Sequence, residues 1–200
     1  MRITDDRYTR DRQRFDLAMR MIHHEARTCT IRTWTGLSDD RIRKLYRSYV
    51  ASHGAAVKRH RGKSPMQTAF FLRNAETRRQ SSALAGLFAI LGLLHEAAAE
   101  AEPSGTLAAL RRGELFCRTY ETYAEFYRSQ RISFEHASRL LSLLRRRAEL
   151  RAGRCPACQA FMVVDALRTT HALCTWCESD ARAQAPGAAP RVGPPVRRAG

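Results

Sequence analysis

Residues 155–177 read CPACQAFMVVDALRTTHALCTWC and hold four of the six cysteines of this 200-residue chain. The spacing C-x2-C-x15-C-x2-C is typical of two tight turns that each direct two sulfur atoms at one metal ion. Two disulfides or a redox dithiol are the competing interpretations. The N-terminal segment is polar and resembles no secretory signal, so we expect a reducing cytoplasm, where structural disulfides are rare. A redox dithiol needs one C-x-x-C and leaves the second pair without a role.

The metal interpretation therefore predicts one structural Zn2+ per chain. Four thiolates arranged as a tetrahedron favour zinc and leave no open position for a catalytic water. The predicted ligands are Cys155, Cys158, Cys174 and Cys177. His171, which lies between the two pairs, is the alternative fourth ligand. Residues 161–164 predict a strand and residues 168–170 a turn, so we expect a short hairpin inside the 15-residue spacer.

Outside this zinc-ribbon-like module, the sequence predicts a mainly α fold. Three apolar stripes recur at helical spacing, and we expect them to form core rather than a base-stacking platform. They are Phe15, Ala18, Met19, Ile22 and Ala26; then Phe116, Tyr120, Tyr123, Ala124 and Tyr127; then Phe134, Ala137, Leu140, Leu141 and Leu144. The longest apolar stretch, residues 83–94, is shorter than the roughly 18 residues that span a membrane, so it predicts a buried helix.

Composition shifts predict three regions. Residues 1–150 would form the helical domain, and residues 151–182 the zinc module. Residues 183–200 are rich in Pro, Gly and Ala, and we expect a disordered tail.

A second stretch, TCTIRTWTGLSDDRIRKLYRSY (residues 28–49), predicts a helix-turn-helix. Gly36 suits the turn, and Ser38 suits the N-cap of a second helix whose inward residues are Ile42 and Leu45. The outward residues would then read DNA: Arg41, Arg43, Lys44 and Arg47. Arg32 stands where a small residue usually lets the two helices cross closely, so an ordinary helical hairpin is the alternative.

The charge distribution favours a nucleic-acid partner. The net charge is +16, and residues 1–64 carry 16 Lys and Arg against 7 Asp and Glu. Such an excess is typical of polyanion binders, among which DNA is favoured over a membrane surface. After the helix-turn-helix stretch, HGAAVKRHRGKSP predicts an arm that contacts phosphates through Lys58, Arg59, Arg61 and Lys63. If the hairpin alternative holds, DNA would instead be reached through Arg151, Arg154 and Arg168.

These features in this order resemble the FlhC family of bacterial flagellar transcriptional activators. The similarity lies in LAMRMIHHEART, TGLSDDRIRKLYRSY, RGKSP and the four terminal cysteines, and it covers roughly residues 15–180. It implies a cytoplasmic DNA-binding subunit with zinc on those cysteines. It also implies that the helical domain, residues 1–150, binds DNA and the helical protein FlhD. The resulting heterohexamer would activate flagellar genes with RNA polymerase. The segment MQTAFFLRN lacks the Trp-containing pattern of the family.

Two other classes of function compete with an activator. One is a zinc-ribbon accessory protein that binds RNA or RNA polymerase without reading DNA sequence. The other is an enzyme, which we do not expect, because the sequence shows no paired carboxylates, no nucleophile–base arrangement and no phosphate-binding glycine loop. His23 and His24 beside Glu25 are the nearest approach to a catalytic cluster, and adjacent helical residues point about 100° apart.

Overall fold

The computed structural model describes residues 2–53, 60, 67–94, 104–167 and 173–183. In chain order these residues form α1 (Arg2–His23), α2 (Thr28–Thr35), α3 (Asp39–His53), a 3-10 turn η2 (Thr68–Leu72), α4 (Ala75–Ile90), α5 (Leu107–Phe126), α6 (Phe134–Arg146), β1 (Leu150–Arg154), β2 (Phe161–Asp165) and α7 (Thr175–Ala183). The mainly α fold with a C-terminal four-cysteine cluster is confirmed. The predicted tail lies outside the described residues. Among the described helices, none has the length and apolarity needed to cross a membrane.

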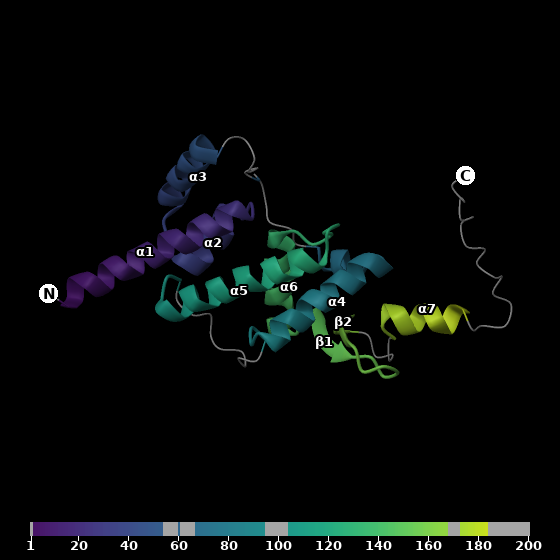
Figure 1. The fold of residues 1–200 in the computed structure, drawn as a ribbon. Helices are drawn as coiled ribbons and strands as arrows, with labels where there is room; N and C mark the ends of the chain where they lie inside the picture. The colour runs from purple at the N-terminus through teal and green to yellow at the C-terminus, as the bar shows by residue number, and fades with distance from the viewer. Residues whose placement is uncertain (1, 54–59, 61–66, 95–103, 168–172, 184–200) are drawn as a thin grey trace, which may run out of the picture.

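The central helix of the fold is α5. It packs against α1 and α2 on one side and against α4 on the other, so that α3 lies at one end of the molecule and α7 at the other (Figure 1). Several of the helices begin with a local cap. The side chains of Asn74, Thr106 and Ser133 accept hydrogen bonds from the N–H groups of the first turns of α4, α5 and α6.

The three predicted stripes form the core. Phe116, Tyr123 and Phe134 are fully buried, and Phe116 contacts Phe134 edge to face. Each member of the stripes is buried or packs against the core, apart from Ala124, which is half-buried. The aromatic residues are therefore core and not a base-stacking platform. Burying these rings removes apolar area from water, and each Å² buried stabilises the fold by about 25 cal/mol.

A buried polar residue joins α4 to the segment between α5 and α6. The carbonyl oxygen of the Gln80 side chain accepts from the hydroxyl of Tyr123, at 2.5 Å, and from the backbone N–H of Arg131, at 2.8 Å. Its amide donates to the backbone oxygen of Ser129. The predicted buried helix over residues 83–94 is confirmed only in part. Helix α4 ends at Ile90, whose side chain is 80 % exposed, and residues 91–94 form a turn.

The two strands form an antiparallel hairpin in which Leu150 pairs with Asp165 and Gly153 with Met162. The predicted strand at residues 161–164 is confirmed, but the predicted hairpin inside the spacer is wrong. The partner strand precedes Cys155, and the first cysteine pair lies in the connection between the strands. The hairpin packs against α4, where the N–H of Val163 donates to Ser82 Oγ at 3.1 Å. Leu150 and Val163 are part of the main hydrophobic core, so hairpin and helices are packed together.

Candidate metal centre and nucleic-acid interface

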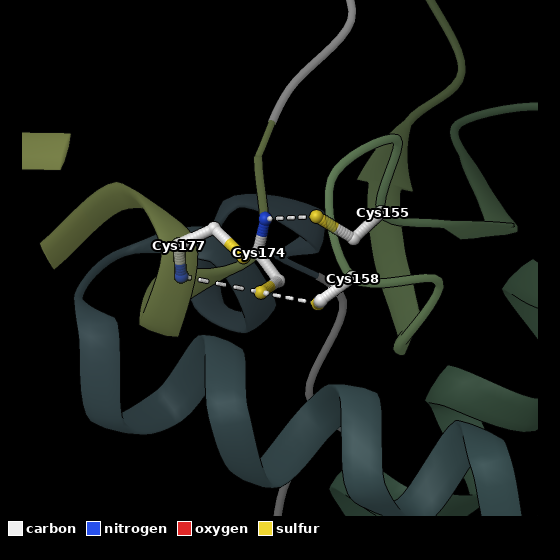
Figure 2. Close-up of side chains that lie close together, drawn as sticks. All are labelled: Cys155, Cys158, Cys174 and Cys177. Carbon is white, nitrogen blue, oxygen red and sulfur yellow. Dashed lines mark hydrogen bonds between the residues drawn. The ribbon is translucent and has the colours of Figure 1, made fainter. Parts of the chain in front are cut away.

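The sulfur atoms of Cys155, Cys158, Cys174 and Cys177 lie within 4.8 Å of one another and face a common centre (Figure 2). The Sγ atoms of Cys158 and Cys174 are 3.5 Å apart. A tetrahedral zinc with Zn–S bonds of about 2.3 Å places its sulfur atoms about 3.8 Å apart. The cluster therefore has the dimensions of a four-thiolate zinc site.

The two cysteine pairs come from different kinds of element. Cys155 and Cys158 lie in the tight connection between β1 and β2, which is closed by hydrogen bonds between the backbones of Cys155 and both Gln159 and Ala160, each 2.9 Å. Gln159 adopts a left-handed backbone with φ of 61°. Cys174 directly precedes α7 and Cys177 lies in its first turn. The sequence prediction did not identify this helix, and the predicted turn at residues 168–170 lies outside the described residues, as does His171.

The electrostatics of the cluster favour a bound cation. Backbone N–H groups, first that of Cys174 at 3.4 Å from Cys155 Sγ, lower the pKa of Cys155 to about 6. The thiol of Cys177 instead hydrogen-bonds to the sulfur atoms of Cys158 and Cys174, which raises its pKa to about 12. Four crowded sulfur atoms therefore do not ionise together without positive charge between them. A divalent cation supplies that charge, so the residues fit zinc.

Within the described part of the chain, no other group of three or more His, Cys, Asp or Glu side chains could hold a metal. The neighbouring histidines His23 and His24 point to different partners. His23 Nδ1 is 2.9 Å from the hydroxyl of Tyr49, and His24 Nε2 is 2.8 Å from Glu121 Oε1. His24 also stacks on Phe134, and burial lowers its pKa. Both rings take part in packing between helices.

The predicted helix-turn-helix stretch folds as two helices joined at Gly36. Gly36 has a left-handed φ of 67° and ends α2, while Ser38 Oγ accepts from the N–H of Arg41 at 3.4 Å. Of the two predicted inward residues, Ile42 is fully buried and Leu45 is partly buried against the core; Leu37 and Tyr46 are buried as well. Arg32 lies on the exposed side of α2 and pairs with Asp39 at 3.1 Å, so its bulk does not separate the two helices.

The side chains predicted to read DNA share the outer surface of α3. All four of them, Arg41, Arg43, Lys44 and Arg47, are exposed. Arg43 pairs with Asp40 at 2.7 Å. The predicted phosphate-contacting residues Lys58, Arg59, Arg61 and Lys63 lie outside the described residues, as does Arg168. From the same basic stretch the structure describes His60, whose Nε2 is 2.7 Å from Glu25 Oε2.

Both ends of α2 are fixed to the helical body. At its start, buried Glu135 of α6 accepts from the N–H of Arg27 at 2.7 Å and from the hydroxyl of Thr30 at 3.0 Å. At its end, Gly36 lies so close to Gly105 that a Cβ atom on Gly36 would be 3.0 Å from Gly105 Cα. Arg14 donates to the carbonyl oxygen of Gly105 at 2.9 Å. These contacts fix the orientation of α2, and hence of α3, relative to α5 and α6.

Comparisons with known proteins give one assignment. A search of curated proteins finds no match. The sequence model of the family described as flagellar transcriptional activator (FlhC) matches residues 4–189, nearly the whole chain. The matched region contains the α2–α3 pair and all four clustered cysteines. The chain therefore belongs to the FlhC family of flagellar transcriptional activators.

Proposed function

We propose that this chain is the DNA-binding subunit of a cytoplasmic activator that assembles with an FlhD-type partner and acts with RNA polymerase at flagellar promoters. The family supports flagellar transcription activation as the process. The DNA-binding role rests on the exposed cationic side chains of α3. Helix α3 is the second helix of the α2–α3 pair, and both ends of α2 are anchored to the rest of the fold.

The geometry of α3 suits entry into a major groove. A recognition helix needs an apolar face toward its own domain and long polar side chains on the other face. Ile42 and Tyr46 supply the buried face, while Arg41 and Lys44 lie one turn apart on the exposed face. Guanidinium and ammonium groups at such positions can donate to the O6 and N7 atoms of guanine. We therefore assign base contacts first to Arg41 and Lys44, and further contacts to Arg43 and Arg47.

The basic stretch after α3 would contact phosphates. Lys58, Arg59, Arg61 and Lys63 follow the recognition helix closely in sequence. Phosphate contacts add affinity that falls with salt and carry no base information directly. The zinc ion, held by Cys155, Cys158, Cys174 and Cys177, would be structural: it would fasten the start of α7 to the hairpin.

Exposed apolar side chains support assembly with a partner. Ile90 at the end of α4, Phe126 at the end of α5 and Trp176 in α7 are 80 %, 73 % and 65 % exposed. Large exposed aromatic residues are enriched in protein–protein contacts. We infer that the isolated chain presents surface that the FlhD-type partner covers in a heterohexamer.

The alternative function, a zinc-ribbon accessory protein, has one observation in its favour. Arg151 and Arg154 are exposed on β1, at the zinc module and not on α3. If these residues carried the binding instead of α3, the zinc module would hold the nucleic acid, either DNA or, in an accessory protein that does not recognise duplex sequence, RNA or RNA polymerase. Binding of a co-expressed complex to a labelled flagellar promoter, with excess bulk DNA as competitor, separates the two functions. An activator stays bound to the promoter. An accessory protein that does not recognise DNA sequence releases the promoter in proportion to the amount of competitor DNA.

A further inference from the structure

The second cysteine pair is fastened to α4 by one arginine. Arg78 donates through Nη1 to Glu178 Oε2 at 2.9 Å and through Nη2 to the carbonyl oxygen of Leu173 at 3.4 Å. Leu173 directly precedes Cys174, and Glu178 directly follows Cys177. The two hydrogen bonds therefore bracket the pair. The planar fork of a guanidinium presents two donor nitrogens side by side, which suits these two acceptors.

The environment of this contact makes it more than a solvated surface pair. The side chains of Arg78 and Glu178 are 25 % and 34 % exposed. Beside them, the guanidinium of Arg79 lies over the ring of Trp176, 5.2 Å from its centroid. Two successive residues of α4 thus contact the first turn of α7 and the residue that leads into it.

The first cysteine pair has a different support. It lies in the connection of a hydrogen-bonded hairpin that contributes Leu150 and Val163 to the main core, so its backbone is held by the hairpin. The second pair lies at the start of α7, with Cys174 directly before the helix and Cys177 in its first turn, and the helix contains nine residues. A helix of that length is marginal by itself and needs tertiary contacts to persist. The contacts with α4 and a shared metal ion would supply them.

We propose that Arg78 is a positioning residue of the metal centre, which holds Cys174 and Cys177 against Cys155 and Cys158 although it is not a ligand. This inference rests on the zinc site proposed above. It makes metal affinity depend on α4, and by linkage it makes the docking of α7 on α4 depend on the metal. Arg79 would contribute less, because its ring contact fixes neither the backbone before Cys174 nor the carboxylate after Cys177.

The test uses the complex co-expressed with its partner. Zinc is titrated out with a chromogenic chelator, and cobalt-loaded protein is examined by absorption spectroscopy. Groups that orient metal ligands typically contribute 10–100-fold in metal affinity. We therefore expect Arg78→Ala to weaken zinc binding by about 10–100-fold. We also expect weaker thiolate-to-cobalt absorption, because Cys174 and Cys177 are displaced.

Four further variants control the experiment. Arg118→Ala removes an exposed arginine from α5 and should leave metal affinity unchanged. Arg78→Lys keeps the charge but cannot bridge both acceptors, so it should fall between the wild type and Arg78→Ala. The single variant Arg78→Glu should be the weakest binder. Adding Glu178→Arg to it restores the ion pair but not the bond to Leu173, so recovery should be partial.

The outcomes separate this inference from the proposal of a zinc site. A wild-type complex without zinc would refute both. One zinc per wild-type chain, together with equal chelator resistance in Arg78→Ala and Arg118→Ala, would refute only the role of Arg78. If Arg78→Ala does not fold, the zinc affinities of Arg78→Lys and of the double variant Arg78→Glu with Glu178→Arg decide the question. A role of charge alone predicts wild-type affinity in both, whereas the positioning role predicts intermediate affinity in both.

Discussion

Replacement of Gly105 by alanine should loosen the contact that holds the end of α2. Gly105 has φ of +77°, and an added Cβ atom would lie 2.8 Å from the carbonyl oxygen of Thr35 and 3.2 Å from Gly36 Cα. The left-handed backbone costs an alanine about 1–2 kcal/mol, and overpacking against backbone that cannot rotate away costs about 1–3 kcal/mol. The lower entropy of the unfolded chain offsets about 0.4–1 kcal/mol. We therefore expect a loss of about 1–4.5 kcal/mol in the free energy of unfolding.

Two other glycines separate the contributions. Gly92 has φ of +84° but no atom within 4 Å of its added Cβ, so Gly92→Ala should show the backbone cost alone, about 1 kcal/mol. Gly86 lies within α4, where an added Cβ meets Phe161 at 3.9 Å, an ordinary contact. Gly86→Ala should therefore stabilise the fold by about 0.5–1 kcal/mol.

The assay is urea unfolding of the zinc-loaded complex, followed by circular dichroism. If Gly105→Ala is no more destabilising than Gly92→Ala, the close approach of the two turns does not exist in solution and the anchoring of α2 is refuted. From most to least stable, the predicted order is Gly86→Ala, wild type, Gly92→Ala and Gly105→Ala.

Four further predictions concern the metal, the anchor, the acid response and assembly. Purified protein should contain one zinc per chain by elemental analysis, and Cys155→Ser or Cys174→Ser should abolish it; none or two would contradict the site. Glu135→Ala should cost about 1–3 kcal/mol in urea unfolding, because buried donors of Arg27 and Thr30 lose their acceptor, whereas Glu135→Gln should be milder. The hydrogen bond from Arg20 lowers the pKa of Glu121 to about 2, so its stabilisation is present above the unfolded pKa and lost as pH falls toward 2. The stability difference between wild type and Glu121→Gln should accordingly shrink below about pH 4.3, and a constant difference would contradict the pairing. The isolated chain should associate in sedimentation experiments and become well behaved with its partner; a stable monomer that ignores the partner argues against assembly.

Local patterns were enough to predict the helical stripes, the helix pair at residues 28–49 and the cysteine cluster, but not α7. The stripes in α1, α5 and α6 repeat at 3.6-residue spacing because each helix buries one face. The sequence shows this periodicity directly. The four cysteines are also recognisable locally, since the C-x2-C spacing brings two sulfur atoms close enough to bind one metal ion. Gly36 and Ser38 likewise carry their own turn and cap preferences.

The missed features depend on residues far apart in the chain. The strand LRAGR has exposed arginines and no alternation, so its pairing with residues 161–165 was not apparent. Helix α7 begins between Cys174 and Cys177, where the C-x2-C spacing led us to predict a tight turn. Glu135 meets Arg27 across 108 residues, and Arg78 meets Glu178 across 100. No periodicity records such pairs, because they arise only after the helices pack.

The central claim is that α3 reads DNA, and a promoter competition experiment tests it most directly. The complex with the FlhD-type partner would be titrated onto a flagellar promoter fragment and onto scrambled DNA. The proteins compared are the wild type, Arg41→Ala, Lys44→Ala and Arg151→Ala, each first checked for bound zinc and partner. We predict that Arg41→Ala and Lys44→Ala each lose about 1–3 kcal/mol of promoter preference, while Arg151→Ala keeps it. Unchanged preference in both α3 variants, with loss in Arg151→Ala, would contradict the claim and place recognition at the zinc module.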